Sequence, residues 1–206
     1  MKTAIIMAAP QEFGIKDKQV KQTEVNGLPI FFSSVGKANA SFCLGKLIAQ
    51  GYDNIINIGT VAGFGLNQGD VVVPKTFIEW DFDLSAMGIP KGQVWNAKSK
   101  YIESKSMFNF NAFKTADCKH LATADCFVDD WQKVFEVDKD VNLIDMESAP
   151  MARICLENNV NFAAIKVVSD NANGDSKLAW YEFVDGQGKD IIKTIVNKLA
   201  IDFAGA

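Results

Sequence analysis

The chain has 206 residues, of which 48% are hydrophobic and 22% are charged, and its formal net charge is −4. This length is enough for one domain with a sizeable hydrophobic core. The mild acidity and the absence of a basic stripe argue against nucleic acid or an anionic membrane surface as the partner. No apolar run approaches the ~20 residues that a membrane-spanning helix needs.

One histidine and four cysteines limit the chemistry that the chain can perform. His120 is alone, and Cys43, Cys118, Cys126 and Cys155 show no CxxC spacing. A zinc site needs clustered ligands of these types, and a Ser-His-Asp triad depends on a well-placed histidine. We therefore expect neither a metal nor another cofactor, and we expect reduced thiols in a cytoplasmic protein.

The first ten residues, MKTAIIMAAP, combine one lysine with a short apolar run, as the start of a secretory leader does. The run is too short for a leader, and acidic and glycine residues follow at once. We therefore expect this segment to be the first strand of the folded domain.

Alternating strand and helix patterns follow along the chain. Apolar runs predict strands at residues 2–9, 28–35, 54–59, 69–82, 141–146 and 161–168. Several of these runs are apolar throughout, which is typical of strands covered on both faces. Helical spacing predicts helices at 37–51, 147–159 and about 188–204. With no linker or repeat, the pattern predicts a single α/β domain over residues 1–206, with a central mixed, mainly parallel sheet flanked by helices.

Three acidic residues come directly after predicted strands. AIIMAAPQE ends on Glu12, NLIDME ends on Glu147, and AIKVVSD ends on Asp170. Each has a simpler explanation: a solvated loop acid, a first-turn acid stabilised by the helix dipole, and a helix N-cap. Ligands of open α/β sheets bind beyond the carboxyl ends of the strands, where all three would meet. Together they indicate general acid–base catalysis at a glycosidic bond.

The glycine-rich stretch NIGTVAGFG, at 57–65, follows a predicted strand. It is neither GxGxxG nor a P-loop, so it predicts no dinucleotide or triphosphate site. Two interpretations stay open: a tight turn, or a loop that lets a ligand approach the backbone while Thr60 offers a hydroxyl.

Six stretches resemble, in order and spacing, the nucleoside phosphorylase and hydrolase superfamily: SVGKANAS, NIGTVAGFG, WDFDLSAMG, TADCFV, DMESAPMARIC and VVSDNANG. The resemblance is closest to the 5′-methylthioadenosine/S-adenosylhomocysteine nucleosidases, and it runs over nearly the whole chain. It implies a nucleoside phosphorylase-like fold. It also implies hydrolysis of the N-glycosidic bond of such nucleosides, which releases adenine and a 5-thioribose.

The resemblance implies roles for the acids and their neighbours. Glu12 resembles the carboxylate that activates the attacking water. Asp170 resembles the acid that protonates the purine at N7 and accepts from the 6-amino group, with Ser169 orienting it. Met146 and Glu147 resemble the pair that holds the ribose, Glu147 accepting from the 2′ and 3′ hydroxyls.

Further positions follow from the same resemblance. Phe127 resembles the ring that stacks on the base, and the backbone of Val128 resembles the segment that recognises the adenine edge. Thr60 and Lys166 fall where the family places a hydroxyl and an arginine near the water. Trp180 falls where an apolar ring covers the 5′ substituent.

A homodimer is implied as well. Leu84, Met87 and Ile89 correspond to a segment that the neighbouring subunit contributes to the pocket. Aromatic residues are common around the 5′ group at the positions of Met87 and Ile89, so the 5′ substituent is the least determined part of the substrate.

The residue types favour adenine as the base and water as the nucleophile. An aspartate can accept from an amino group and donate to N7, whereas an asparagine suits a 6-oxo purine. Phosphate sites favour the planar fork of arginine, and we expect Arg153, the one arginine, to point away from the pocket. Three alternatives stay open: a purine nucleoside phosphorylase, a hydrolase of another 5′-modified adenosine such as a futalosine derivative, and a non-catalytic nucleoside-binding protein.

Overall fold

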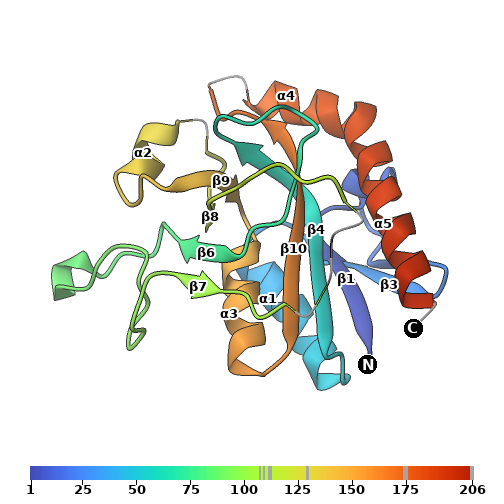
Figure 1. The fold of residues 1–206 in the computed structure, drawn as a ribbon, viewed down its shortest axis with the longest axis horizontal. Coiled ribbons are helices and arrows are strands. Elements are labelled where there is room, and N and C mark those ends of the chain that lie inside the picture. Colours follow the sequence, from blue (N-terminus) through green and yellow to red (C-terminus); the bar gives the residue numbers. More distant parts are fainter. Residues whose placement is uncertain (107, 109, 111–112, 129, 174–175, 205–206) are drawn as a thin grey trace.

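The computed structural model describes residues 1–106, 108, 110, 113–128, 130–173 and 176–204. A ten-stranded mixed sheet flanked by helices dominates them (Figure 1), which confirms the α/β class. The strands are β1 (Thr3–Met7), β2 (Gln22–Val25), β3 (Leu28–Phe32), β4 (Asn54–Gly63), β5 (Val71–Val72), β6 (Thr76–Glu79), β7 (Ile102–Glu103), β8 (His120–Thr123), β9 (Val141–Asp145) and β10 (Asn161–Asp170). The helices are α1 (Lys37–Ala49), α2 (Trp131–Phe135), α3 (Ser148–Glu157), α4 (Ser176–Phe183) and α5 (Lys189–Ala204), with short turns η1 (Pro10–Phe13), η2 (Ser85–Met87) and η3 (Val184–Gly188).

Two expectations from the sequence are wrong. The single strand expected over 69–82 is two strands, β5 and β6, which pair with different neighbours. Pro74 lies between them, and a proline has no N–H to donate to a ladder. The glycine-rich stretch 57–65 is no separate loop, because residues up to Gly63 continue β4 alongside β10.

β4 and β10 form the centre of the sheet. They pair in parallel from Asn54 and Asn161 to Ala62 and Asp170, with a register shift between Val168 and Asp170. Both are almost entirely buried, which explains their continuous apolar sequences.

The other edge of β4 is only partly occupied. Its first part pairs in parallel with β1 as far as Asn57, which lies opposite Ile6. Its end pairs antiparallel with β9 through Ala62 and Gly63. Among the strands that the structure describes, none pairs with residues 58–61 on this edge. That stretch of β4 is therefore free to offer backbone groups to side chains and ligands.

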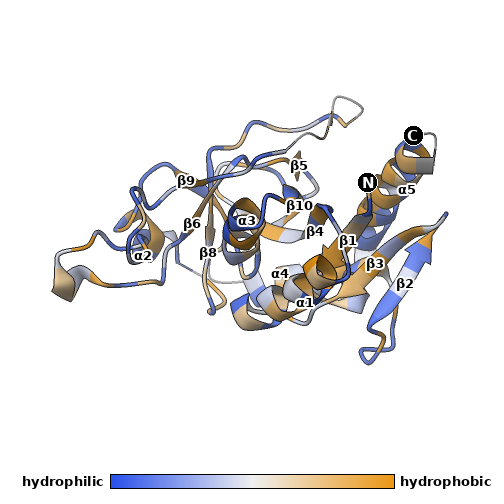
Figure 2. Cartoon of the chain, turned by 90° about the horizontal axis from the view of Figure 1, so that it is seen from below, coloured by the Kyte–Doolittle hydropathy of each residue, from blue (hydrophilic) through white to orange (hydrophobic). Residues whose placement is uncertain are grey.

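Helices cover both faces of the sheet. Successive residues of β1 point to opposite faces: Ala4 and Ile6 pack with α1 and α3, and Ile5 and Met7 pack with α5. Figure 1 shows α5 along one side of the sheet, with α1 and α3 behind it. At the edge, β2 is largely hydrophilic (Figure 2), as an exposed edge strand requires.

Residues 81–100 project from the body of the domain and include η2 (Figure 1). A separate apolar cluster joins α2 to β6 and β8, with Trp131, Ile78 and Ala122 among its buried members. This cluster fixes the position of the loop between β8 and α2, which borders the pocket described next.

Candidate active site

A cavity of about 490 Å³ lies at the carboxyl ends of β1, β4 and β10, beside the open edge of β4. Its volume is typical of a pocket for a small organic molecule. The structure brings together in its lining all ten residues that the sequence assigned to this chain's own site: Glu12, Thr60, Phe127, Val128, Met146, Glu147, Lys166, Ser169, Asp170 and Trp180.

Glu12 is held at the open edge of β4. It lies in η1 rather than at a strand end, and its residue is only 3% exposed. Its Oε1 accepts hydrogen bonds from the backbone N–H of Thr60 (2.8 Å) and from the Thr60 hydroxyl (2.9 Å). Its Oε2 accepts from the N–H of Ala9 at 3.2 Å. A Cβ on Gly59 would lie 3.1 Å from Oε1, so this glycine leaves the space that the carboxylate fills.

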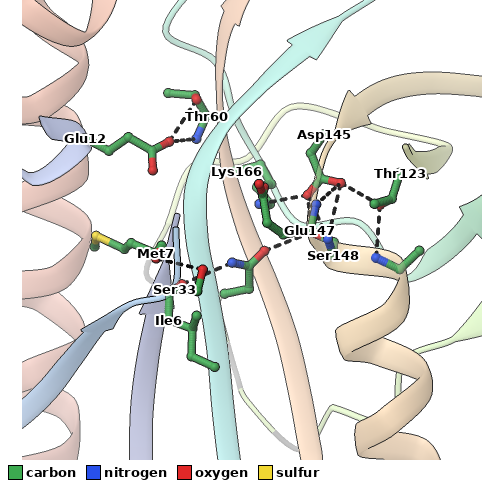
Figure 3. Close-up of polar contacts among 12 residues, drawn as sticks. Ile6, Met7, Glu12, Ser33, Thr60, Thr123, Asp145, Glu147, Ser148 and Lys166 are labelled. Carbon is green, nitrogen blue, oxygen red and sulfur yellow. Dashed lines mark hydrogen bonds and ion pairs between the residues drawn. The ribbon is translucent and has the colours of Figure 1, made fainter. Parts of the chain in front are cut away.

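An ion pair lies at the far end of the same cavity (Figure 3). The Nζ of Lys166 lies 2.9 Å from Oδ2 of Asp145, and each side chain is 1% exposed. Asp145 also accepts from the hydroxyls of Thr123 and Ser148 and from the N–H of Ser148. Every charge of the pair is therefore partnered, as a buried pair requires.

Glu147 follows this pair at the N-terminus of α3. Its Oε1 accepts from the N–H of Gly36 at 3.0 Å. Burial first, and then the neighbouring charge of Asp145, raise the pKa of Glu147 to about 8, although Lys166 and the Gly36 bond act in the opposite direction. Glu147 takes the N-cap position of α3, directly before the first turn that the sequence suggested, and its side chain lies in the pocket lining.

Asp170 is the last residue of β10 and is not a helix cap. Its Oδ2 accepts from the Ser169 hydroxyl at 2.7 Å, and its Oδ1 accepts from the N–H of Ala172 at 3.0 Å. The same hydroxyl lies 3.3 Å from the carbonyl oxygen of Val61. Since a hydroxyl has one proton, Ser169 can donate to only one of these acceptors at a time. The pair can therefore accommodate either protonation state of Asp170.

Two walls complete the cavity. Phe127 is 52% exposed and lines the mouth beside the buried Val128, so its ring is accessible for stacking. Opposite, Lys177, Trp180 and Tyr181 line the pocket from α4, at positions that share one helix face.

The segment around Leu84, Met87 and Ile89 lies in the projecting residues 81–100 and does not line this cavity. Met87 is 60% exposed at its tip. Arg153 also lies away from the cavity, where its Nε donates to Glu79 at 3.2 Å.

Sequence reasoning missed Asp145, Lys177 and Tyr181 as pocket residues. Asp145 carried a usable signal, because it precedes Glu147 by two residues at the end of the same strand. Lys177 and Tyr181 carried none, because the helix that presents them, α4, was not predicted.

No metal-binding group of three or more His, Cys, Asp or Glu side chains occurs within the described part of the chain. Nor does any described helix have the length and apolar character that crossing a membrane demands.

The fold and the pocket have counterparts among known proteins. A family model described as the phosphorylase superfamily matches residues 18–197, and the chain belongs to this superfamily.

Its curated relatives include nucleosidases. The 5′-methylthioadenosine/S-adenosylhomocysteine nucleosidase of Geobacillus sp. is 29% identical over 230 aligned positions, which cover 97% of this chain and 99% of that protein. The enzyme of the same name from Exiguobacterium sp. is 30% identical and covers 76% of this chain and 72% of its own length. The alignment has 230 positions, more than the 206 residues of this chain, so the Geobacillus protein contains residues that have no counterpart in this chain.

Solved structures share the fold over nearly the full length. The Streptococcus pneumoniae MTA/SAH nucleosidase in complex with 8-aminoadenine has a TM-score of 0.81 at 24% identity, with 97% of this chain and 99% of that chain covered. The futalosine hydrolase of Helicobacter pylori has a TM-score of 0.80 at 21% identity, with coverage of 98% and 97%. At these identities the likeness establishes the shared fold.

Proposed function

We propose that this protein hydrolyses the N-glycosidic bond of 5′-methylthioadenosine and S-adenosylhomocysteine, releasing adenine and a 5-thioribose. The observation that carries the proposal is the convergence of Glu12, Glu147 and Asp170 in the lining of one cavity of about 490 Å³, a volume that suits a nucleoside. The full-length relatives named as nucleosidases of these two compounds support it.

Asp170 acts as the general acid. It donates a proton to N7 of the purine and accepts from the 6-amino group, which makes adenine a better leaving group. While Asp170 is protonated, the Ser169 hydroxyl donates to the carbonyl of Val61. After the proton has moved to the base, it turns to the new carboxylate. Phe127 stacks on the departing ring, and the backbone of Val128 contacts its edge.

Glu12 and Glu147 act on the sugar. Glu147 accepts from the 2′ and 3′ hydroxyls of the ribose beside Met146, and Glu12 removes a proton from the water that attacks C1′. The transition state resembles an oxocarbenium ion. The buried carboxylate of Glu12 stabilises its positive charge, because it acts in a site of low dielectric.

Water is the proposed nucleophile rather than phosphate. Arg153 is engaged with Glu79 away from the cavity, and Lys166 is paired with Asp145. The one guanidinium fork of the chain is therefore not available to a phosphate ion beside Glu12, and Lys166, which lines the same cavity, lacks such a fork.

A hydrolase of another 5′-modified adenosine is the second candidate. Lys177 lines the pocket together with Trp180 and Tyr181, and a lysine on this wall suits a 5′ group that ends in a carboxylate, as the homocysteine of S-adenosylhomocysteine also does. The futalosine hydrolase of Helicobacter pylori shows that the same fold serves a hydrolase with a different name.

The proposal includes a cytoplasmic homodimer. Leu84, Met87 and Ile89 would reach the pocket of the neighbouring subunit, since the segment that carries them projects from the domain. A Met87→Glu variant should dissociate in sedimentation velocity and lose activity. A parent chain that sediments as a monomer at assay concentration would contradict this part of the proposal.

The activity is tested by measuring adenine release from methylthioadenosine, S-adenosylhomocysteine and a futalosine, with and without added phosphate. Asp170→Asn, which cannot protonate N7 as a carboxylic acid does, should lower kcat by ~10²–10⁴-fold. Phosphate-dependent formation of a pentose 1-phosphate would identify a phosphorylase. Tight nucleoside binding with no turnover would identify a binding protein.

A further inference from the structure

The indole N–H of Trp180 is committed to a side chain of the pocket. Its Nε1 donates to Oγ1 of Thr60 at 2.8 Å, from α4 across to β4. Thr60 in turn donates from the same oxygen to Oε1 of Glu12 at 2.9 Å. The two bonds form a chain from the covering helix to the carboxylate that acts on water, and we refer to Trp180, Thr60 and Glu12 in this order as the relay.

The donor inventory fixes the direction of the relay. An indole nitrogen only donates, whereas a hydroxyl carries one proton and two acceptor positions. When Trp180 donates to Thr60, the hydroxyl can accept from the ring and direct its own proton to Glu12. Without the indole N–H, the Thr60 hydroxyl can rotate toward another acceptor without losing a hydrogen bond from Trp180.

Among the groups that donate hydrogen bonds to Glu12, the Thr60 hydroxyl is the one whose direction can change. The backbone N–H groups of Thr60 and Ala9 are fixed by β4 and by η1, and they donate whatever the side chains do. The Thr60 hydroxyl rotates about its C–O bond, so only a partner can determine where its proton lies. In this structure that partner is the side chain of Trp180, which is half-buried in the pocket wall.

We propose that Trp180 is a positioning residue for the water-activating carboxylate: its indole N–H orients the Thr60 hydroxyl, which aligns Glu12. This inference rests on the proposed function and adds to it a task beyond covering the 5′ group. The position of α4 therefore sets both one wall of the cavity and the alignment of the base.

The test separates the N–H of Trp180 from its ring. Trp180→Phe keeps an aromatic wall and removes the donor, and Thr60→Val keeps the shape and the backbone N–H while it removes the hydroxyl. Because each variant breaks at least one of the two bonds of the relay that aligns Glu12, each should lower kcat by about tenfold or more. The KM for methylthioadenosine should change by less than about threefold, since the aromatic wall is kept.

The double variant decides between orientation and simple covering. In the Thr60→Val background, Trp180→Phe should lower kcat by less than about twofold, because both changes break the same relay. Equal losses in both backgrounds, or a loss confined to KM, would overturn the inference. Phe42→Leu, at an exposed position of α1 outside the cavity lining, is the control and should keep the parent kcat.

A second measurement needs no turnover. In ¹⁵N-labelled protein, the indole N–H resonance that disappears in Trp180→Phe should shift in Thr60→Val, because its acceptor has been removed. An unchanged resonance would overturn the relay. A shifted resonance in a chain that releases no adenine would support the relay and overturn the proposed function.

Discussion

Replacing Lys166 by methionine tests how the pocket tolerates its buried charges. Lys166 and Asp145 are each 1% exposed at the side chain and lie 2.9 Å apart. The substitution keeps an unbranched chain of similar length but leaves Asp145 without its cation. Removing one partner of a buried ion pair costs about 3–5 kcal/mol.

The lower end of that range applies here, because Asp145 keeps its hydrogen bonds from Thr123 and Ser148. We expect a loss of about 3 kcal/mol in the free energy of unfolding. In a domain of this size this loss lowers Tm by about 6–12 °C. The measurement is urea unfolding followed by circular dichroism, with the m-value as a check that the unfolded states remain comparable.

Two controls make the result interpretable. Lys119→Met removes the cation of an exposed pair with Asp140, whose side chains are 61% and 63% exposed. Such a pair contributes at most about 1 kcal/mol. Adding Asp145→Asn to Lys166→Met should restore at least half of the lost stability, because it neutralises the stranded carboxylate. If Lys166→Met cost no more than Lys119→Met, the argument from burial would be refuted.

Three further outcomes are expected. Burial and Asp145 raise the pKa of Glu147 from 4.5 to about 8. The contribution of Glu147 to the free energy of unfolding is therefore full below pH 4.5 and is lost as the pH rises toward 8. Glu147→Gln should remove this pH dependence of the free energy of unfolding, as measured by urea titrations. Gly59→Ala should fold but lose about tenfold or more in kcat, because the new Cβ would lie 3.1 Å from Oε1 of Glu12 and displace this oxygen. An unchanged kcat would contradict the tight fit. Leu44→Ala, on the buried face of α1, should lower the free energy of unfolding by about 2–5 kcal/mol and leave KM unchanged, whereas a loss under about 1 kcal/mol would mean that the core around it repacks.

The chemical identity of the site was readable from the sequence because its signals are local. Each acid lies at or within a few residues of the end of an apolar strand: Asp170 ends β10, Glu147 comes two residues after β9, and Glu12 comes five residues after β1. Ligands of α/β sheets bind at such strand ends. That reasoning predicted that Glu12, Glu147 and Asp170 would meet in one pocket, and the structure brings them together there.

Local patterns failed where pairing decides the structure. The glycine-rich residues that follow the strand predicted at 54–59 looked like a turn or a loop, but pairing with β10 continues the strand as far as Ala62. Short elements such as α4, which carries Trp180, have too few residues for a clear period.

The sequence by itself therefore determined the class of fold and the acids of the pocket, because strand and helix periodicity and residue type are properties of neighbouring residues. Only the tertiary structure decided how those acids are held. β4 is left open between β1 and β9, which lets Thr60 reach Glu12. The bond from Trp180 to Thr60 joins residues 120 positions apart. No local pattern encodes such a contact, because it depends on the register of several strands and on the seating of a helix at once.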